Sequence, residues 1–123
     1  MTFTKACILV IEDEPSIRTF LRTLLLDEGY RVETASDGLD GLRQLGCGPD
    51  LILLDLQMPV MDGYEFLGRL RTTTDHGATP VVVVTANLNG RAIDGVQGLL
   101  RKPFEVATLL GQVSDLLHAF PLA

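Results

Sequence analysis

Acidic, hydroxyl and basic side chains follow four separate apolar runs of this chain. In order along the chain these residues are Glu12 with Asp13, Asp55, Thr85 and Lys102. Three carboxylates brought together would repel one another and raise each other's pKa unless a cation joined them. Mg²⁺ suits such a set, because it prefers oxygen ligands and is usually held by a few carboxylates with water and phosphate. The residue types therefore indicate phosphoryl-transfer chemistry beside a divalent metal.

Asp55 is the natural nucleophile of this set, because a carboxylate can accept a phosphoryl group as an aspartyl phosphate. Lys102 would bind the phosphate with a fixed positive charge, and Thr85 would add a hydroxyl donor. Lys102 and Mg²⁺ would together neutralise charge on the transferring group. Each residue alone has a simpler explanation, such as a loop acid or a strand-end hydroxyl that satisfies the backbone. Their common position at the ends of apolar runs favours the functional interpretation.

The apolar runs predict the strands that must position these residues. Residues 6–11, 51–54 and 81–84 are continuously apolar, which is typical of parallel strands covered on both faces. A weakly alternating segment at 31–35 predicts an outer strand, and residues 99–100 predict a short last strand. Ligand sites in parallel sheets lie at the carboxyl ends of the strands, so the four segments should meet at one edge.

Apolar residues at helical spacing fill the intervals between these runs. A first helix is predicted from Pro15, which suits a first turn, to Gly29, which suits a helix end. Its apolar stripe comprises Ile17, Phe20, Leu21, Leu24 and Leu25. The other predicted helices are one capped by Ser36 or Asp37 and running through Leu45, one at about 64–71, and one at about 105–117 whose stripe begins at Val106.

Strand and helix alternate five times, and this order predicts the fold class. Right-handed crossovers give a single three-layer, doubly wound α/β domain with a five-stranded parallel sheet. The chain has 123 residues, which suits one domain, and we expect residues 1–123 to carry no separate effector domain. A fourth helix, at about 87–98 between the last two strands, should be shortened or irregular, because this stretch holds three glycines and two asparagines.

Composition excludes several classes of function. Hydrophobic residues make up 46% of the chain, which indicates a folded core. The net charge of −6 argues against direct nucleic-acid binding through this domain's own surface. No apolar run is long enough to span a bilayer and no signal peptide is visible, so a cytoplasmic location is expected. Cys7 and Cys47 are interpreted as a buried small hydrophobe and a loop thiol.

Four segments together resemble the receiver domains of bacterial two-component response regulators. They are ILVIEDEP (8–15), LILLDLQMPVMDG (51–63), VVVVTAN (81–87) and LLRKPF (99–104). The combination is specific, although no single piece would be, and it covers nearly the whole chain. The resemblance implies a flavodoxin-like fold, in agreement with the strand and helix pattern.

The resemblance assigns metal-binding roles to the acidic residues. Glu12 and Asp13 resemble the acidic pair that holds Mg²⁺ directly or through water. Asp55 resembles the phosphoacceptor, which is also a metal ligand. The backbone carbonyl of Gln57 resembles a further ligand to the metal.

The resemblance also assigns the phosphate-binding and switch residues. Thr85 resembles the hydroxyl residue that turns towards the phosphoryl group, and Lys102 resembles the phosphate-binding lysine. The Lys102–Pro103 bond corresponds to one that is cis in this family, as befits a proline. Leu99 stands at a switch position where the family usually has an aromatic residue that rotates inward. Leucine has no ring to swing, so the usual coupling between the threonine and the aromatic residue is altered here.

The interval between Thr85 and Lys102 is short for this family. Only sixteen residues lie between them, so roughly one helical turn is missing. The loss falls on the fourth helix, which Gly90 and Gly95 already weaken. Because that helix commonly belongs to the dimer or output face, we predict that the usual fourth-helix dimer, across residues 87–98, is not used.

The resemblance implies a phosphorylation-activated signalling switch of a two-component or phosphorelay system. Asp55 would accept a phosphoryl group, with Mg²⁺, from a histidine kinase or histidine phosphotransfer protein. A downstream effector protein or fused domain would read the change. The domain would not be an enzyme, apart from assisting its own phosphorylation and dephosphorylation. Arg18 and Arg22 of the first helix are candidate charges for kinase docking.

Two other functions remain as alternatives. A phosphatase of the haloacid-dehalogenase type also uses an aspartate nucleophile, Mg²⁺ and a lysine, but Gln57 stands where such proteins have a second aspartate. A phosphorylation-independent interaction module with a receiver fold is favoured only by Leu99 and the short fourth helix. Three convergent acids argue against it.

Overall fold

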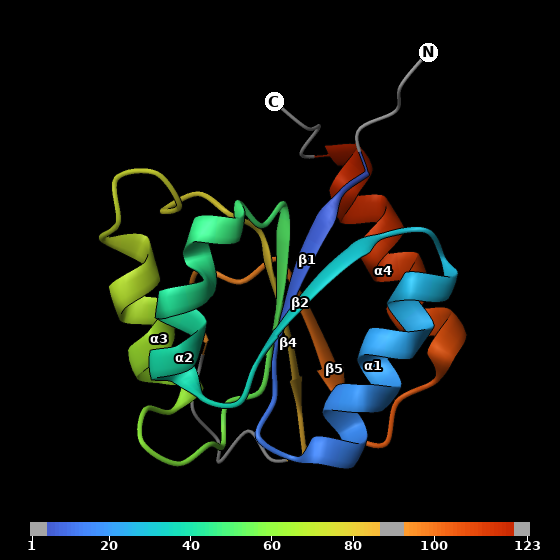
Figure 1. Ribbon diagram of the computed structural model, residues 1–123, viewed down its shortest axis with the longest axis horizontal. Helices are drawn as coiled ribbons and strands as arrows, with labels where there is room; N and C mark the ends of the chain where they lie inside the picture. Colours follow the sequence, from blue (N-terminus) through green and yellow to red (C-terminus); the bar gives the residue numbers. More distant parts are fainter. Residues whose placement is uncertain (1–4, 87–92, 120–123) are drawn as a thin grey trace.

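The computed structural model describes residues 5–86 and 93–119. This part of the chain contains five strands and four α-helices, which alternate except that β5 follows β4 with no helix among the described residues between them (Figure 1). The strands are β1 (Cys7–Ile11), β2 (Arg31–Ala35), β3 (Leu51–Leu54), β4 (Val81–Thr85) and β5 (Gly98–Arg101). The helices are α1 (Pro15–Asp27), α2 (Gly38–Arg43), α3 (Gly63–Arg71) and α4 (Val106–Ala119), with a 3₁₀ turn, η1 (Gln44–Cys47), after α2.

The strands form one parallel sheet in the order β2-β1-β3-β4-β5. Helices α1 and α4 cover one face of the sheet, and α2 and α3 cover the other (Figure 1). This arrangement confirms the predicted three-layer, doubly wound α/β fold. In the described part of the chain, no helix is both long enough and apolar enough to cross a membrane.

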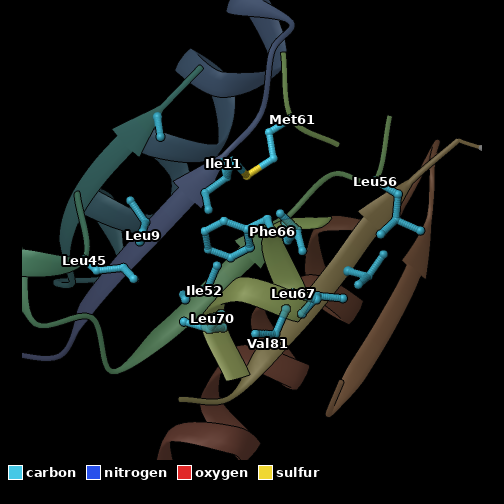
Figure 2. Packing of buried hydrophobic residues seen from close by; sticks show 13 residues of the cluster. Leu9, Ile11, Leu45, Ile52, Leu56, Met61, Phe66, Leu67, Leu70 and Val81 are labelled. Carbon is cyan, nitrogen blue, oxygen red and sulfur yellow. The ribbon is translucent and has the colours of Figure 1, made fainter. Parts of the chain in front are cut away.

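Every residue of β1, β3 and β4 is buried, because each strand contributes to a core on both faces. Successive side chains of a strand point to opposite faces, so Leu9 and Ile11 join the α2–α3 core while Ile8 and Val10 join the α1–α4 core. Phe66 of α3 is fully buried in the α2–α3 core and lies among Ile11, Ile52 and Leu70 in Figure 2. Two-sided packing explains why these strands are continuously apolar in the sequence.

Local hydrogen bonds fix where the helices begin. Glu14, directly before Pro15, caps α1: its carboxylate accepts a hydrogen bond from the Ser16 N–H. The carboxylate of Asp62 accepts from the Glu65 N–H at 2.9 Å and caps α3 in the same way. Side-chain oxygens at this position satisfy backbone donors that have no partner within the helix.

Three details differ from the sequence prediction. Helix α2 ends at Arg43, before Leu45, and continues only as η1, which closes at Gly48 with φ of 69°. Phe20 was expected on the buried stripe of α1 but is 49% exposed, because Leu21 and Leu25 define the buried row and Phe20 lies at its border. Val106 is 38% exposed, because it opens α4 ahead of the buried residues Leu109 and Val113.

The segment that leads into β5 is held by hydrogen bonds to other elements. The Arg71 guanidinium at the end of α3 donates to the carbonyls of Gly77, Thr79 and Gly95. Described residues 93–97 contain no helix. Asn87 and Gly90, on which part of the fourth-helix prediction rests, lie outside the described residues.

Candidate functional site at the carboxyl end of the sheet

Glu12 and Asp55 follow the neighbouring strands β1 and β3, and backbone hydrogen bonds set their positions. The Glu12 N–H donates to the Ala35 carbonyl and the Asp55 N–H donates to the Ile11 carbonyl, both at 3.0 Å. Carboxylate oxygens of Glu12, Asp13 and Asp55 lie within 4.8 Å of one another. The structure therefore brings together the three acids that the sequence places after two different strands.

Lys102 reaches the same cluster from the end of β5. Its Nζ lies 2.5 Å from Glu12 Oε1 and 3.4 Å from Asp55 Oδ2. The Lys102 N–H donates to the Thr85 carbonyl at 2.8 Å, and the Lys102–Pro103 peptide bond is cis. The lysine is thus the cation that faces the carboxylates of the cluster among the described residues.

Thr85 and Leu99 lie on neighbouring strands near this edge of the sheet. Thr85 is the buried last residue of β4 and pairs in register with Arg101, whereas Leu99 pairs with Val83. Residues that pair in register, or lie two apart in a strand, share a face of the sheet. Leu99 therefore shares a face with Val83 and Thr85, and it is 43% exposed. This exposure leaves an apolar side chain beside the predicted switch residue.

The two oxygens of Asp55 have different surroundings. Oδ1 accepts from the Gln57 N–H at 3.2 Å, and Oδ2 faces the Lys102 ammonium. Gln57 also lines a surface cleft of about 350 Å³ together with Asp13 and Asp62. The carboxylate of Asp55 is therefore oriented by the backbone on one side and by a cation on the other, next to a cleft that a substrate group could enter.

Burial and charge shift the pKa values of the Glu12–Lys102 pair. Burial is the main reason that the pKa of Glu12 rises to about 7, and the charge of Asp55 adds to the rise, although Lys102 and the Glu14 N–H oppose it. Burial lowers the pKa of Lys102, but its hydrogen bond to Glu12 and the attraction of Asp55 outweigh that effect, so its pKa is raised. The lysine accordingly stays charged at neutral pH.

This donor set fits a hard divalent cation. Three carboxylates lie within 4.8 Å of one another and only two of them pair with the Lys102 ammonium, so acidic groups outnumber the cation that faces them. All three side chains offer oxygen, which is the ligand type that Mg²⁺ prefers, and the adjoining cleft leaves room for coordinated water. Glu12 and Asp55 are buried while Asp13 is more open to solvent.

Two features of the structure were not predicted from the sequence. Arg18, interpreted as a docking charge, donates to the carbonyls of Glu12 and Asp13. Cys7 and Cys47, interpreted separately, lie with their sulfur atoms 3.8 Å apart. No motif or spacing marks either contact, because both depend on how the turns between elements close.

Comparison with known proteins agrees with this site and fold. A family model for the response regulator receiver domain matches residues 8–114. The chain therefore belongs to the family of response regulator receiver domains, and the resemblance inferred from its motifs is confirmed. Receiver domains of this family function in two-component signalling and bind Mg²⁺ at an acidic pocket.

Individual relatives give the same result. Response regulator ArlR of Staphylococcus aureus is 35% identical over 122 residues, which cover 93% of this chain and 53% of ArlR. The chain thus spans about half the length of that relative. Chemotaxis response regulator CheY4 of Vibrio cholerae superposes with a TM-score of 0.84 at 35% identity, covering 93% of this chain and all of CheY4.

A further structural neighbour is the response regulator TrrA of Thermotoga maritima, whose structure is a complex with Mg²⁺ and BeF. It superposes with a TM-score of 0.81 at 32% identity, covering 91% of this chain and 99% of TrrA.

Proposed function

We propose that this receiver domain is switched by phosphorylation of Asp55. The observation that supports this most directly is the convergence of Glu12, Asp13, Asp55 and Lys102 at one edge of the sheet. The donor is a phosphohistidine on a histidine kinase or a histidine phosphotransfer protein. A downstream effector protein or fused domain reads the change.

In the transfer step, an Asp55 carboxylate oxygen forms a bond to phosphorus while the bond between phosphorus and the donor imidazole nitrogen breaks. The electron pair of the broken bond leaves with the imidazole. Asp55 Oδ2 is the oxygen beside Lys102, so the ammonium is placed to bind the incoming phosphoryl oxygens. The Gln57 N–H holds Oδ1 and keeps the carboxylate oriented.

Glu12, Asp13 and Asp55, with the backbone carbonyl of Gln57, would hold Mg²⁺. The bound metal would neutralise charge on the transferring phosphoryl group. The complex of TrrA with Mg²⁺ and BeF supports, by analogy, that this chain also binds Mg²⁺. Glu12 and Lys102 are already paired, so phosphoryl binding by Lys102 competes with that ion pair.

Thr85 is the proposed switch residue, and Leu99 takes the position of its usual aromatic partner. Phosphoryl binding draws the Thr85 hydroxyl towards the site and changes the packing beside Leu99. Since Leu99 is partly exposed, its surroundings can change without rearrangement of the buried core. The domain assists its own phosphorylation and dephosphorylation through the same residues.

The dimer that receiver domains commonly form through the helix before the last strand, which corresponds to residues 87–98 here and not to α4, is not expected for this protein. Described residues 93–97 form no helix, and the interval before Lys102 is short. Light scattering of the unphosphorylated and phosphorylated protein should therefore find no dimer that residues 87–98 mediate. A dimer built on an ordered helix there would contradict this part of the proposal.

Intact-protein mass spectrometry tests the proposed function directly. After incubation with Mg²⁺ and a small acyl phosphate, we expect a single phosphoryl adduct that chelator or Asp55→Asn abolishes. Asp62→Asn is the matched control, because Asp62 lines the same cleft and Asn also caps helices. Folded protein that binds Mg²⁺ but gains no adduct from the acyl phosphate or a cognate kinase would favour the phosphorylation-independent module. Turnover of a phosphate ester would favour a phosphatase.

A further inference from the structure

Arg18 hydrogen-bonds to the backbone carbonyls of the acidic pair and not to their carboxylates. Its Nη1 donates to the Glu12 carbonyl at 2.9 Å and to the Asp13 carbonyl at 3.3 Å. Arg18 lies in the first turn and a half of α1 and is half-buried. A terminal guanidinium nitrogen carries two N–H donors, so one nitrogen can serve both carbonyls.

The turn between β1 and α1 is held from several sides. The Glu12 N–H donates to the Ala35 carbonyl at 3.0 Å, and the Glu14 N–H donates to Glu12 Oε2 at 3.1 Å. Arg18 adds hydrogen bonds to the backbone carbonyls of Glu12 and Asp13. The carboxylate of Glu12 is paired with Lys102, not with Arg18. The guanidinium thus fixes the chain that carries two acids without neutralising either of them by direct contact.

We propose that Arg18 is a positioning residue for the metal site. It holds the Glu12–Asp13 backbone so that both carboxylates are presented to Mg²⁺ before the metal arrives. The inference rests on the proposed function, because it assigns a role to Arg18 at that same site. It is an alternative to the interpretation of Arg18 as a docking charge, which stays a prediction.

The physical basis is preorganisation. A turn that must be ordered when the metal binds loses conformational entropy at that moment, which weakens binding. Groups that orient metal ligands typically change metal affinity by about 10-fold to 100-fold when they are removed. An arginine suits this task better than a lysine, because the planar guanidinium fixes the directions of its N–H donors whereas the three ammonium donors of lysine rotate freely.

The first test is Mg²⁺ affinity by titration calorimetry on unphosphorylated protein. Arg18→Gln should weaken Mg²⁺ binding by about tenfold. The matched control is Arg22→Gln, which removes the same charge one turn further along α1 from an exposed position, and it should stay close to wild type. Unchanged affinity in Arg18→Gln, or equal losses in the two variants, would overturn the proposal.

Arg18→Lys separates positioning from charge. It keeps the positive charge but not the planar guanidinium with its fixed donor directions, so its Mg²⁺ affinity should fall nearer to that of Arg18→Gln than to wild type. If Arg18→Lys bound Mg²⁺ with wild-type affinity, the positive charge alone would explain the effect of Arg18, and the positioning role would be overturned. Amide hydrogen exchange provides a second measurement that needs no metal. Exchange at the Glu12 and Glu14 N–H groups should be faster in Arg18→Gln than in Arg22→Gln. Thermal unfolding checks that both variants are folded.

Phosphorylation by a small acyl phosphate excludes kinase docking, because no kinase is present. Arg18→Gln should need about tenfold more Mg²⁺ for half-maximal rate and reach nearly the wild-type rate at saturation. A defect seen only with the kinase would overturn positioning and restore docking. Should wild-type protein bind Mg²⁺ but take no phosphoryl group, the proposed function fails, while the calorimetric comparison still decides the role of Arg18.

Discussion

Cys7 Sγ lies 3.8 Å from Cys47 Sγ, although the residues are 40 positions apart in the chain. Both are free thiols. Asp50 fixes Cys7 by accepting from its N–H at 2.8 Å and donating its own N–H to the Cys7 carbonyl at 2.7 Å. Cys7 begins β1, so the thiol pair lies at the opposite end of that strand from Glu12.

Oxidation should join these two thiols. A dithiol-specific oxidant would take two electrons and two protons from the pair, and the sulfur atoms need to approach by about 2 Å to reach disulfide length. Closing a loop of this size should raise the free energy of unfolding by about 4 kcal/mol. Urea unfolding of the oxidised and reduced forms measures the difference, with Cys47→Ser as the variant that should not respond. An oxidised protein no more stable than the reduced one would contradict the prediction.

Raising the pH should weaken the fold through the same thiols. Burial raises the pKa of Cys47 from 9.0 to about 12, with the neighbouring Cys7 adding to the shift, and burial also raises the pKa of Cys7. The folded protein therefore holds these protons more tightly than the unfolded chain does. Their contribution to stability is complete below pH 9 and is lost between pH 9 and about 12.

Urea unfolding at several pH values across this interval checks the sign of the effect. The double variant Cys7→Ser with Cys47→Ser removes the thiols and leaves other alkaline titrations in place. Wild-type protein should lose more stability than this variant as the pH rises. Equal slopes in the two proteins would show that the thiols do not contribute.

Gly63→Ala should disturb both stability and the acidic site. A Cβ at this buried position would lie 2.6 Å from the Asp55 carbonyl oxygen and 2.7 Å from Leu56 Cα. Backbone must move to relieve this overlap, at a cost of about 1–3 kcal/mol, and the displaced backbone carries Asp55. We expect a lower denaturation midpoint together with weaker Mg²⁺ binding.

Gly68→Ala is the control within the same helix. Gly68 is exposed, and an added Cβ would meet nothing within 4 Å. Alanine should therefore stabilise α3 by about 0.5–1 kcal/mol and leave Mg²⁺ affinity unchanged. If both variants behaved alike, close packing at Gly63 would not be the cause.

Val60→Gly should stabilise the protein. Val60 has φ of 69° and is 76% exposed, so a β-branched residue adopts a left-handed conformation with little packing to compensate. Left-handed backbone costs an L-residue roughly 1–2 kcal/mol, and glycine escapes most of that cost. A gain of about 1 kcal/mol over wild type in urea unfolding is expected, and Val60→Ala, which keeps its Cβ, should gain less.

The sequence predicted the sheet and the acidic cluster well for a common reason. Strands covered on both faces are continuously apolar, as residues 51–54 and 81–84 are, and parallel strands bring the residues after them to one edge. Glu12, Asp55 and Lys102 were therefore predictable as residues of one edge of the sheet, although Lys102 reaches the two acids across β4, which lies between β3 and β5. The prediction needed only which residue follows each strand.

Features that depend on turn geometry or on the border of a buried face escaped prediction. Phe20 matches a helical stripe by period, yet period alone does not say how wide the buried row is. Arg18 is an ordinary polar residue of α1 in the sequence, and its contact with the Glu12 carbonyl depends on how the chain leaves β1. Cys7 and Cys47 meet only because η1 closes beside the start of β1.

The attachments of Gly95 and Gln97 have a consequence for how this domain tolerates changes in length. Arg71 holds the Gly95 carbonyl, while Gln97 exchanges two hydrogen bonds with Val81, through its N–H at 2.9 Å and its side-chain oxygen at 2.7 Å. These hydrogen bonds fix the chain directly before Gly98, where β5 begins, and therefore set the register of β5 on β4. Insertions or deletions between Thr85 and Gly95 can accumulate in evolution without displacing Lys102, so this segment can vary in length while the proposed phosphoryl-binding lysine stays where it is.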